Sequence, residues 1–171
     1  NLLTHLGVAP GDRVAVQVAK SPQALAVYAA CVQAGIVFLP LNTAYTADEV
    51  SYFADNSGAR LILCDSKASG TLDPVARACG AGLETMNADG GGSFADQAAA
   101  MPVSFETVDR SADDLAAFLY TSGTTGRSKG AMLTQGNLLS NCQTLAAEWR
   151  FTADDTLLHA LPIFHTHGLF V

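Results

Sequence analysis

The hydrophobic residues in the first half of the chain fall into short continuous runs, and segments with helical spacing lie between these runs. The runs predict four strands, at Arg13–Val18, Ile36–Leu39, Leu61–Cys64 and Leu83–Met86. The segments between them predict three helices, which include Leu25–Val32, Val50–Phe53 and Asp73–Cys79. Strands that alternate with helices at this spacing are typically parallel and joined by helical crossovers. Because the strands are continuously apolar, we expect a sheet covered on both faces.

Two of the predicted helices have recognisable ends. Ser21 suits the N-cap of the first helix, Pro22 its first position, and Gly35 its C-terminal cap. Thr46 and Glu49 have the spacing of a capping box at the start of the second helix. These residues predict where the two helices begin and where the first one ends.

Little periodicity is visible in the middle of the chain. The glycine-rich stretch 87–93 (NADGGGS) predicts a flexible surface connection. A phosphate loop is the alternative there, but no lysine and no capped helix follow closely enough to favour it. Residues 101–110 predict an irregular surface segment.

Ordered elements return in the last third. Leu115–Tyr120 predicts a buried strand, residues 121–130 a loop, and Thr156–Leu161 a further strand. Between the loop and the last strand, the spacing predicts a helix with one apolar face in the core, formed by Leu138, Cys142, Leu145 and Trp149. Together these elements predict an α/β fold with layered, mostly parallel sheets flanked by helices.

Composition and charge limit the partners of this fold. The 171 residues suit one domain or one lobe of a longer protein, and 49% hydrophobic with 15% charged residues is typical of a globular chain. The net charge of -7 disfavours nucleic acid and anionic membranes as partners, but a few N–H donors and one lysine can still bind a nucleotide. No signal peptide or long apolar span is visible, although the chain starts at Asn1 and not at a methionine.

Cysteine usage indicates a reducing compartment. Cys31, Cys64, Cys79 and Cys142 lie in apolar stretches and form no CxxC pair. We therefore expect buried free thiols and a cytoplasmic protein, with a zinc site or a disulfide as the less favoured alternatives.

The segment Tyr120–Gly130, YTSGTTGRSKG, carries the candidate chemistry. Its glycines let the backbone approach a ligand closely, and consecutive N–H groups can form a concave anion site. Lys129 adds a positive charge, so the segment suits a polyphosphate better than it suits a plain surface turn. It is not a Walker loop, because the second glycine counted from Gly123 would fall at Ser128, and Gly130 follows the lysine in place of serine or threonine.

This segment resembles the phosphate-loop signature of the adenylate-forming superfamily, which includes acyl-CoA synthetases. Leu161–Gly168 (LPIFHTHG) is similar to the superfamily's next motif, which lines the acyl pocket, and Gly35–Asn42 (GIVFLPLN) resembles its N-terminal lobe. The stretches LNTAYTADEVSYF, WRFTADD and HALPIFHTHGLFV resemble malonyl-CoA synthetases. The resemblance is weakest over residues 68–110. It implies that residues 1–171 are a partial N-terminal AMP-binding domain, incomplete at both ends.

The resemblance also implies a two-step reaction. A carboxylate attacks the α-phosphate of Mg²⁺-bound ATP to give an acyl-adenylate and pyrophosphate, and the thiol of CoA then displaces AMP. Lys129 would neutralise charge as pyrophosphate leaves, which makes it a catalytic residue. The residues that would wrap the β- and γ-phosphates are Thr121, Ser122, Gly123, Thr124, Thr125 and Gly126.

The second motif implies two residues that contact the acid. His165 would lie at the mouth of the acyl pocket as a catalytic and substrate-binding residue, and Thr166 near the substrate α-carbon. A small hydroxyl residue there suits a short polar acid such as malonate or methylmalonate. A packing or capping role for His165 is one alternative, and a metal pair with His167 is another. No third ligand is identifiable, so no metal site is expected.

Other residues of the superfamily would lie beyond Val171. They are an acidic residue for Mg²⁺, an Asp for the ribose, a hinge and a C-terminal domain with a catalytic lysine. The chain alone is therefore expected to be inactive, and its parent to be an AMP-forming acid–CoA ligase. A synthetase for another acyl or aryl acid and a non-catalytic nucleotide-binding module are the alternative functions.

Overall fold

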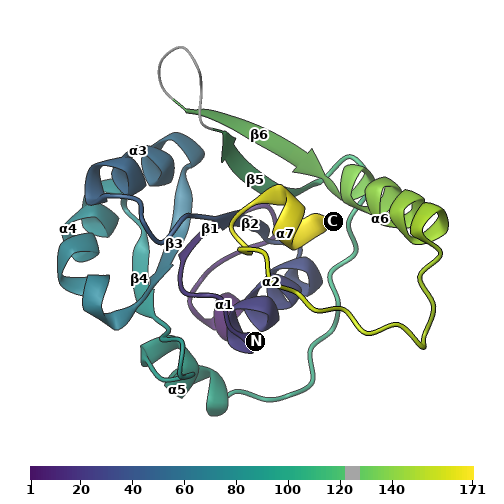
Figure 1. Ribbon diagram of the computed structural model, residues 1–171. Helices are drawn as coiled ribbons and strands as arrows, with labels where there is room; N and C mark the ends of the chain where they lie inside the picture. The colour runs from purple at the N-terminus through teal and green to yellow at the C-terminus, as the bar shows by residue number, and fades with distance from the viewer. Residues whose placement is uncertain (122–127) are drawn as a thin grey trace.

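Six strands form one sheet among residues 1–121 and 128–171, which the computed structural model describes (Figure 1). The strands are β1 (Arg13–Gln17), β2 (Val37–Pro40), β3 (Ala59–Cys64), β4 (Gly82–Thr85), β5 (Leu115–Thr121) and β6 (Lys129–Thr134). Their order in the sheet is β4-β3-β1-β2-β5-β6. Strands β1 to β5 pair in parallel, whereas β6 is antiparallel to β5. The predicted mostly parallel α/β fold is confirmed, and β6 is an addition to it.

Helices cover both faces of this sheet (Figure 1). One face carries α1 (Leu2–His5), α2 (Pro22–Ala34) and α5 (Ser93–Ala99). The other face carries α3 (Ala47–Ser57) and α4 (Ser69–Cys79), the latter preceded by a short 3₁₀ turn at Ser66–Ala68. Strand β6 leads into α6 (Gln135–Trp149), and α7 (Thr166–Phe170) follows near the C-terminus.

Alternate residues of the strands separate the core into two layers. Val14 and Val16 of β1 pack toward α2, whereas Ala15 between them packs toward α3. Neighbouring residues of β2 divide in the same way, because Phe38 joins the α2 side and Leu39 the α3 side. Fully burying a leucine or phenylalanine contributes about 1.5–3 kcal/mol, so both layers contribute to stability.

The predicted helix ends are confirmed. The Ser21 hydroxyl accepts a hydrogen bond from the amide of Ala24 at 3.1 Å, and Gly35 ends α2 with φ of 66°. At the start of α3, the amide of Thr46 donates to the Glu49 carboxylate at 2.8 Å, which is one half of the predicted capping box. These short-range bonds fix α2 and α3 at the carboxyl ends of β1 and β2.

The face of α2 that is buried against the sheet is not the face that carries the large apolar residues Leu25 and Val32. Leu25 and Val32 are exposed, whereas Val27 and Cys31 are buried together with small alanines. Helical spacing locates the helix correctly, but here the small side chains face the sheet.

Two elements of the C-terminal third differ from prediction. Residues 156–161 form no strand, and Leu157 and Leu158 are 75% and 90% exposed. A strand needs a hydrogen-bonded neighbour, and none of the six strands of the sheet pairs with these residues. Helix α6 forms as predicted, but none of its residues is buried, so the predicted core face from Leu138 to Trp149 is wrong for this chain.

The structure of residues 87–110 agrees better with its prediction than the C-terminal third does. Residues 87–92 form a turn closed by the Asn87 amide on the Gly91 carbonyl at 2.8 Å, and residues 101–110 have no helix or strand. Helix α5, between these segments, is not predicted by the sequence pattern because it spans only 7 residues.

The cysteines divide into buried and exposed thiols. All four are free, Cys31 and Cys64 are buried, Cys79 is half-buried and Cys142 is exposed, so the prediction of buried thiols is wrong for the last. Burial raises the pKa of the Cys31 thiol to about 12, and burial with the Asp65 charge raises the pKa of Cys64 to about 11. Over the described ranges, no cluster of three potential metal ligands occurs, and no helix has the length and apolar character needed to cross a membrane.

Candidate active site

The β5–β6 hairpin brings two of the predicted phosphate ligands together. Thr121 ends β5 and pairs with Lys129, the first residue of β6. The Thr121 hydroxyl donates to the Lys129 carbonyl at 3.3 Å, and both residues are exposed. Lys129 and Gly130 therefore belong to a strand and not to the predicted loop. The other predicted phosphate ligands lie outside the described residues: Ser122, Gly123, Thr124, Thr125 and Gly126.

The position of this hairpin in the sheet is suited to ligand binding. Strand β5 is parallel to β2, so Thr121 lies at the carboxyl end of the parallel strands. Because β6 is antiparallel, its first residue, Lys129, lies at the same edge. Open α/β sheets bind ligands outside the carboxyl ends of their strands. The ammonium group is thus carried at the edge where an anionic ligand is expected.

An aromatic cluster attaches the hairpin to α3. The ring of Tyr120 lies 4.3 Å from that of Phe53, 5.3 Å from Phe118 and 6.0 Å from Tyr52, measured between centroids. The Tyr120 hydroxyl donates to the Asn56 side-chain oxygen at 2.7 Å. Burial, with the nearby Tyr52, raises the pKa of Tyr120 to about 12, so this hydroxyl keeps its proton at neutral pH.

The missing side chain of Gly130 leaves room for the Phe118 ring beside β6. A Cβ atom at this position would lie 2.0 Å from Cε1 of the Phe118 ring. That separation is far inside van der Waals contact, so any larger residue must displace the ring or the strand.

Replacing Gly130 by alanine is therefore expected to lower the free energy of unfolding by about 1–3 kcal/mol, the usual cost of overpacking. Urea unfolding of the chain, followed by circular dichroism, measures this change. Gly70→Ala in α4 is the matched control, because a Cβ atom there meets nothing within 4 Å. The control should gain about 0.5–1 kcal/mol from helix propensity, and equal effects in the two variants would contradict the proposed contact.

The second motif is anchored on the α2 side. Ile163 is buried in the α2-side core, and the Asn141 side chain of α6 donates to the Phe170 carbonyl at 2.7 Å. The Lys20 ammonium donates to the Leu161 carbonyl at 2.9 Å and also contacts the His159 carbonyl. Since Lys20 follows the end of β1, it holds residues 159–161 near the same carboxyl edge as the hairpin.

His165 and Thr166 lie side by side at the start of α7. His165 occupies the N-cap position without a side-chain capping bond, and its ring lies 4.6 Å from that of Phe164. Both predicted residues are exposed. His167 lies inside the helix, so the geometry of a histidine pair on one strand does not occur.

The two parts of the site rest on opposite faces of the sheet. Phe118 and Tyr120 of the hairpin pack on the α3-side core, whereas Ile163 and Leu169 pack on the α2-side core. A hydrogen bond links Thr121 with Lys129, whereas His165 lies in a separate segment at the start of α7. The predicted site residues that the structure describes thus fall into two groups, Thr121 with Lys129 and His165 with Thr166, which we call the two half-sites.

Several anchoring residues are not predicted from the sequence. Lys20, Asn141, Tyr52 and Asn56 hold the two half-sites, and none belongs to either motif. The spacing of four residues places Tyr52 and Asn56 on one face of α3, but no sequence signal indicates what that face contacts.

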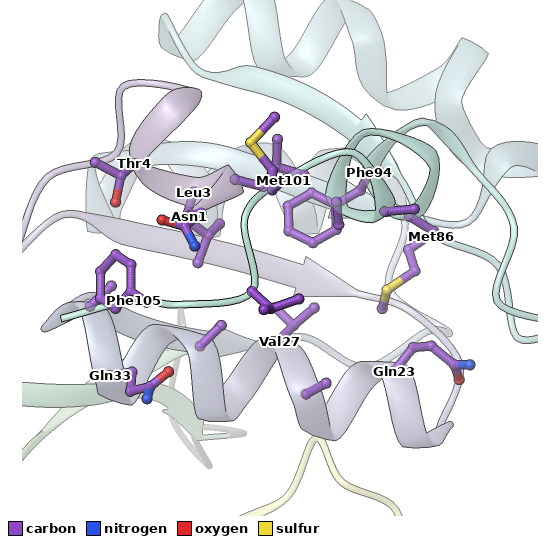
Figure 2. A pocket seen from close by; sticks show the side chains of 18 of the residues that line it. Asn1, Leu3, Thr4, Gln23, Val27, Gln33, Met86, Phe94, Met101 and Phe105 are labelled. Atoms are coloured by element: carbon purple, nitrogen blue, oxygen red, sulfur yellow. The ribbon is translucent and has the colours of Figure 1, made fainter. Parts of the chain in front are cut away.

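A separate cavity of about 490 Å³ lies between α1, α2 and α5, with residues 101–105 along one wall (Figure 2). Val27, Met86 and Phe94 give it a mainly apolar lining. The Asn1 side-chain amide is occupied by the carbonyls of Pro102 and Ser104, at 2.6 and 2.8 Å. Of the predicted site residues that the structure describes, none lines this cavity.

Comparison with known proteins gives a consistent family. A family model described as an AMP-binding enzyme matches residues 1–171. The crystal structure of ATP-bound MatB from Rhodopseudomonas palustris is 55% identical with a TM-score of 0.97, covering 99% of this chain and 34% of MatB.

Curated relatives carry ligase names. An oxalate–CoA ligase from Arabidopsis thaliana is 33% identical over 173 residues, which cover 98% of this chain and 34% of the ligase. A malonate–CoA ligase from the same plant is 33% identical over 144 residues, which cover 80% of this chain and 23% of the ligase. The chain thus spans about a third or less of the length of these relatives.

Proposed function

The chain belongs to the AMP-binding enzyme family of adenylate-forming acyl-CoA ligases, and from this premise we propose that the polypeptide containing it activates a short carboxylic acid, malonate or methylmalonate. The acid would react with ATP to form an acyl-adenylate, and CoA would then take up the acyl group. The observation that carries this proposal is the pairing of Thr121 with Lys129 at the carboxyl edge of the sheet, within the family's phosphate motif.

The donor set at this edge fits a polyphosphate. Lys129 offers an ammonium group and Thr121 a hydroxyl, and neither strand end carries a carboxylate that would repel phosphate oxygens. Charge-assisted hydrogen bonds from such donors are about twice as strong as neutral ones. Use of ATP is supported by the ATP-bound form of MatB, which is 55% identical to this chain.

In the first half-reaction, a carboxylate oxygen of the acid would bond to the α-phosphorus of ATP. The bond from that phosphorus to the bridging oxygen of pyrophosphate would break, and negative charge would build up on the leaving group. Lys129 would bind this charge as it develops, which lowers the barrier more than equal binding of ATP would. Mg²⁺ would neutralise phosphate oxygens, but its protein ligands are not assigned to residues of this chain.

In the second half-reaction, the thiol of CoA would attack the acyl carbonyl, and AMP would leave with the bonding electrons. His165 and Thr166 are proposed to border the acid in both steps, because they lie together and exposed at the start of α7. A threonine leaves little room for bulk at the α-carbon, which favours malonate, and methylmalonate with its single methyl group, over acids with larger substituents at that carbon.

Pyrophosphate exchange on the full-length protein tests this function. ATP, labelled pyrophosphate and one acid at a time would be supplied, with malonate, methylmalonate, oxalate, ferulate and a long-chain fatty acid as the panel. Exchange with malonate or methylmalonate is the expected result. Exchange only with another acid would overturn the choice of substrate, and no exchange with any acid would favour a non-catalytic nucleotide-binding module.

Replacing Thr166 by glycine is expected to widen the acid profile. Loss of the side chain makes room at the α-carbon, so the ratio of kcat/KM for an α-branched acid to that for malonate should rise about tenfold, the effect of one or two carbon atoms in a pocket. Thr166→Ser removes only a methyl group, so its ratio of kcat/KM values should lie between those of the wild type and Thr166→Gly. An unaltered substrate profile in Thr166→Gly would place this residue outside the acid site.

A further inference from the structure

We propose that Tyr52 and Asn56 of α3 are positioning residues, which hold Lys129 and Thr121 at the separation that the reaction proposed above requires. The inference rests on that proposed function. Neither residue belongs to the phosphate motif or to the acyl-pocket motif, and both lie about 70 positions before the hairpin that they hold.

Each arm of the hairpin is attached to α3 through one tyrosine hydroxyl, and the Tyr120 hydroxyl also lies 3.4 Å from the Phe53 carbonyl oxygen of α3. The Tyr52 hydroxyl donates to the Ser128 carbonyl at 2.9 Å, and Ser128 directly precedes Lys129. The Tyr120 hydroxyl donates to the Asn56 side-chain oxygen at 2.7 Å, and Tyr120 directly precedes Thr121. The two bonds thus fix the residues next to the two predicted phosphate ligands.

Helix α3 holds these bonds in a defined place, because it is packed into the core and capped at its start. Tyr52 and Asn56 are separated by four residues, so they lie on one face of the helix, one turn apart. Val50 and Phe53 are buried beside them, and the capping box at Thr46 fixes the start of the helix. Movement of either hairpin arm therefore requires a bond to a packed element to break.

Positioning matters because an ammonium group contributes to catalysis only where the charge develops. Functional groups must be held within about 0.5 Å of the productive geometry by the residues around them. Between the arms, the antiparallel ladder of β5 and β6 pairs Thr121 with Lys129, and the Thr121 hydroxyl adds a side-chain bond to the Lys129 carbonyl at 3.3 Å. The bond from Tyr52 is shorter and ends one residue from the lysine, so its loss would let the start of β6 shift.

The test compares Tyr52→Phe with Tyr45→Phe in the full-length protein. Tyr52→Phe keeps the ring and removes the hydroxyl. It is expected to raise KM for ATP in pyrophosphate exchange about fivefold, the factor that corresponds to about 1 kcal/mol for one neutral hydrogen bond, while KM for the acid stays the same. Tyr45 lies in the same aromatic cluster, 4.9 Å from Phe53, and none of its hydrogen bonds among the described residues reaches the hairpin, so its variant should match the wild type.

Asn56 provides an independent pair of variants. Asn56→Ala removes the nearer of the two acceptors of the Tyr120 hydroxyl and should raise KM for ATP in the same way. Asn56→Asp keeps an oxygen at that position and should restore the wild-type value. A general loss of stability would lower the amount of active enzyme without changing KM for ATP alone.

The outcomes separate this inference from the proposed function. The positioning role would be overturned, and the function would stand, if the wild type catalyses exchange and both Tyr52→Phe and Asn56→Ala have the same KM for ATP as Tyr45→Phe. Absence of exchange in the wild type would overturn the function and the positioning role with it.

Discussion

Replacing Lys129 by alanine in the full-length protein is expected to slow acyl-adenylate formation about 10- to 150-fold, because a hydrogen bond to a charged group contributes about 1.5–3 kcal/mol. The side chain is exposed at the start of β6, and none of the ion pairs found among the described residues includes it. Its removal should therefore change the free energy of unfolding by no more than about 0.5 kcal/mol. Pyrophosphate exchange and urea unfolding measure the two effects.

Lys67→Ala is the matched control for this variant. Lys67 is also exposed, lies in the 3₁₀ turn after β3 and carries the same charge. The control should leave exchange unchanged, which separates a local role of Lys129 from a general effect of net charge. Equal exchange rates in the wild type and in Lys129→Ala would refute the catalytic role of the lysine.

Replacing Phe53 by alanine is expected to cost about 3–5 kcal/mol of the free energy of unfolding. The side chain is 2% exposed and supports the hairpin through Tyr120, with further ring contacts to Tyr45 and Tyr52. A loss of this size is a large part of the 5–15 kcal/mol that typical domains have in total. Urea unfolding of the chain, followed by circular dichroism, provides the measurement.

Phe151 is the appropriate comparison for Phe53. It is 52% exposed, and its one ring contact is with Trp149, at 5.7 Å. Phe151→Ala should cost less than about 1 kcal/mol, since most of its surface is already in water. A similar cost for the two phenylalanines would show that the aromatic cluster does not support the hairpin.

Local patterns of sequence predict the first five strands well, because β1, β2 and β3 are largely buried and the helices α2 and α3 have their own capping residues. Ser21 and the pair Thr46–Glu49 act within a few residues of themselves, and their bonds form as predicted. The sixth strand is different. Lys129–Thr134 is largely exposed, and only its pairing with β5 makes it a strand.

The reverse error at Thr156–Leu161 has the same physical origin. An apolar run predicts a strand only where a neighbouring strand is available, and the sequence alone does not identify that neighbour. Here none of the six strands pairs with residues 156–161, although β4 and β6 both lie at an edge of the sheet. Leu157 and Leu158 consequently lie exposed in an irregular segment.

The candidate site was accessible to prediction as far as its motifs extend. The phosphate motif identifies Thr121 and Lys129, which the structure pairs, and the second motif identifies His165 and Thr166, which it places at a helix start instead of on a strand. The supporting residues are hidden from sequence reasoning, because the bond from Tyr52 to Ser128 spans 76 positions. Contacts over such a distance follow from the packing of α3 on the sheet and not from any local pattern.

The seating of the two half-sites on opposite sides of the sheet has a consequence for how such an enzyme can diversify. Substitutions that contact Ile163 and Leu169 would shift His165 and Thr166, the residues proposed to border the acid. The sheet separates these positions from the aromatic cluster that supports the hairpin. Under the proposed function, substitutions in the α2-side core would then change the preference for the acid. The α3-side core, which supports Lys129 and Thr121, would stay the same, and so would the reaction with ATP.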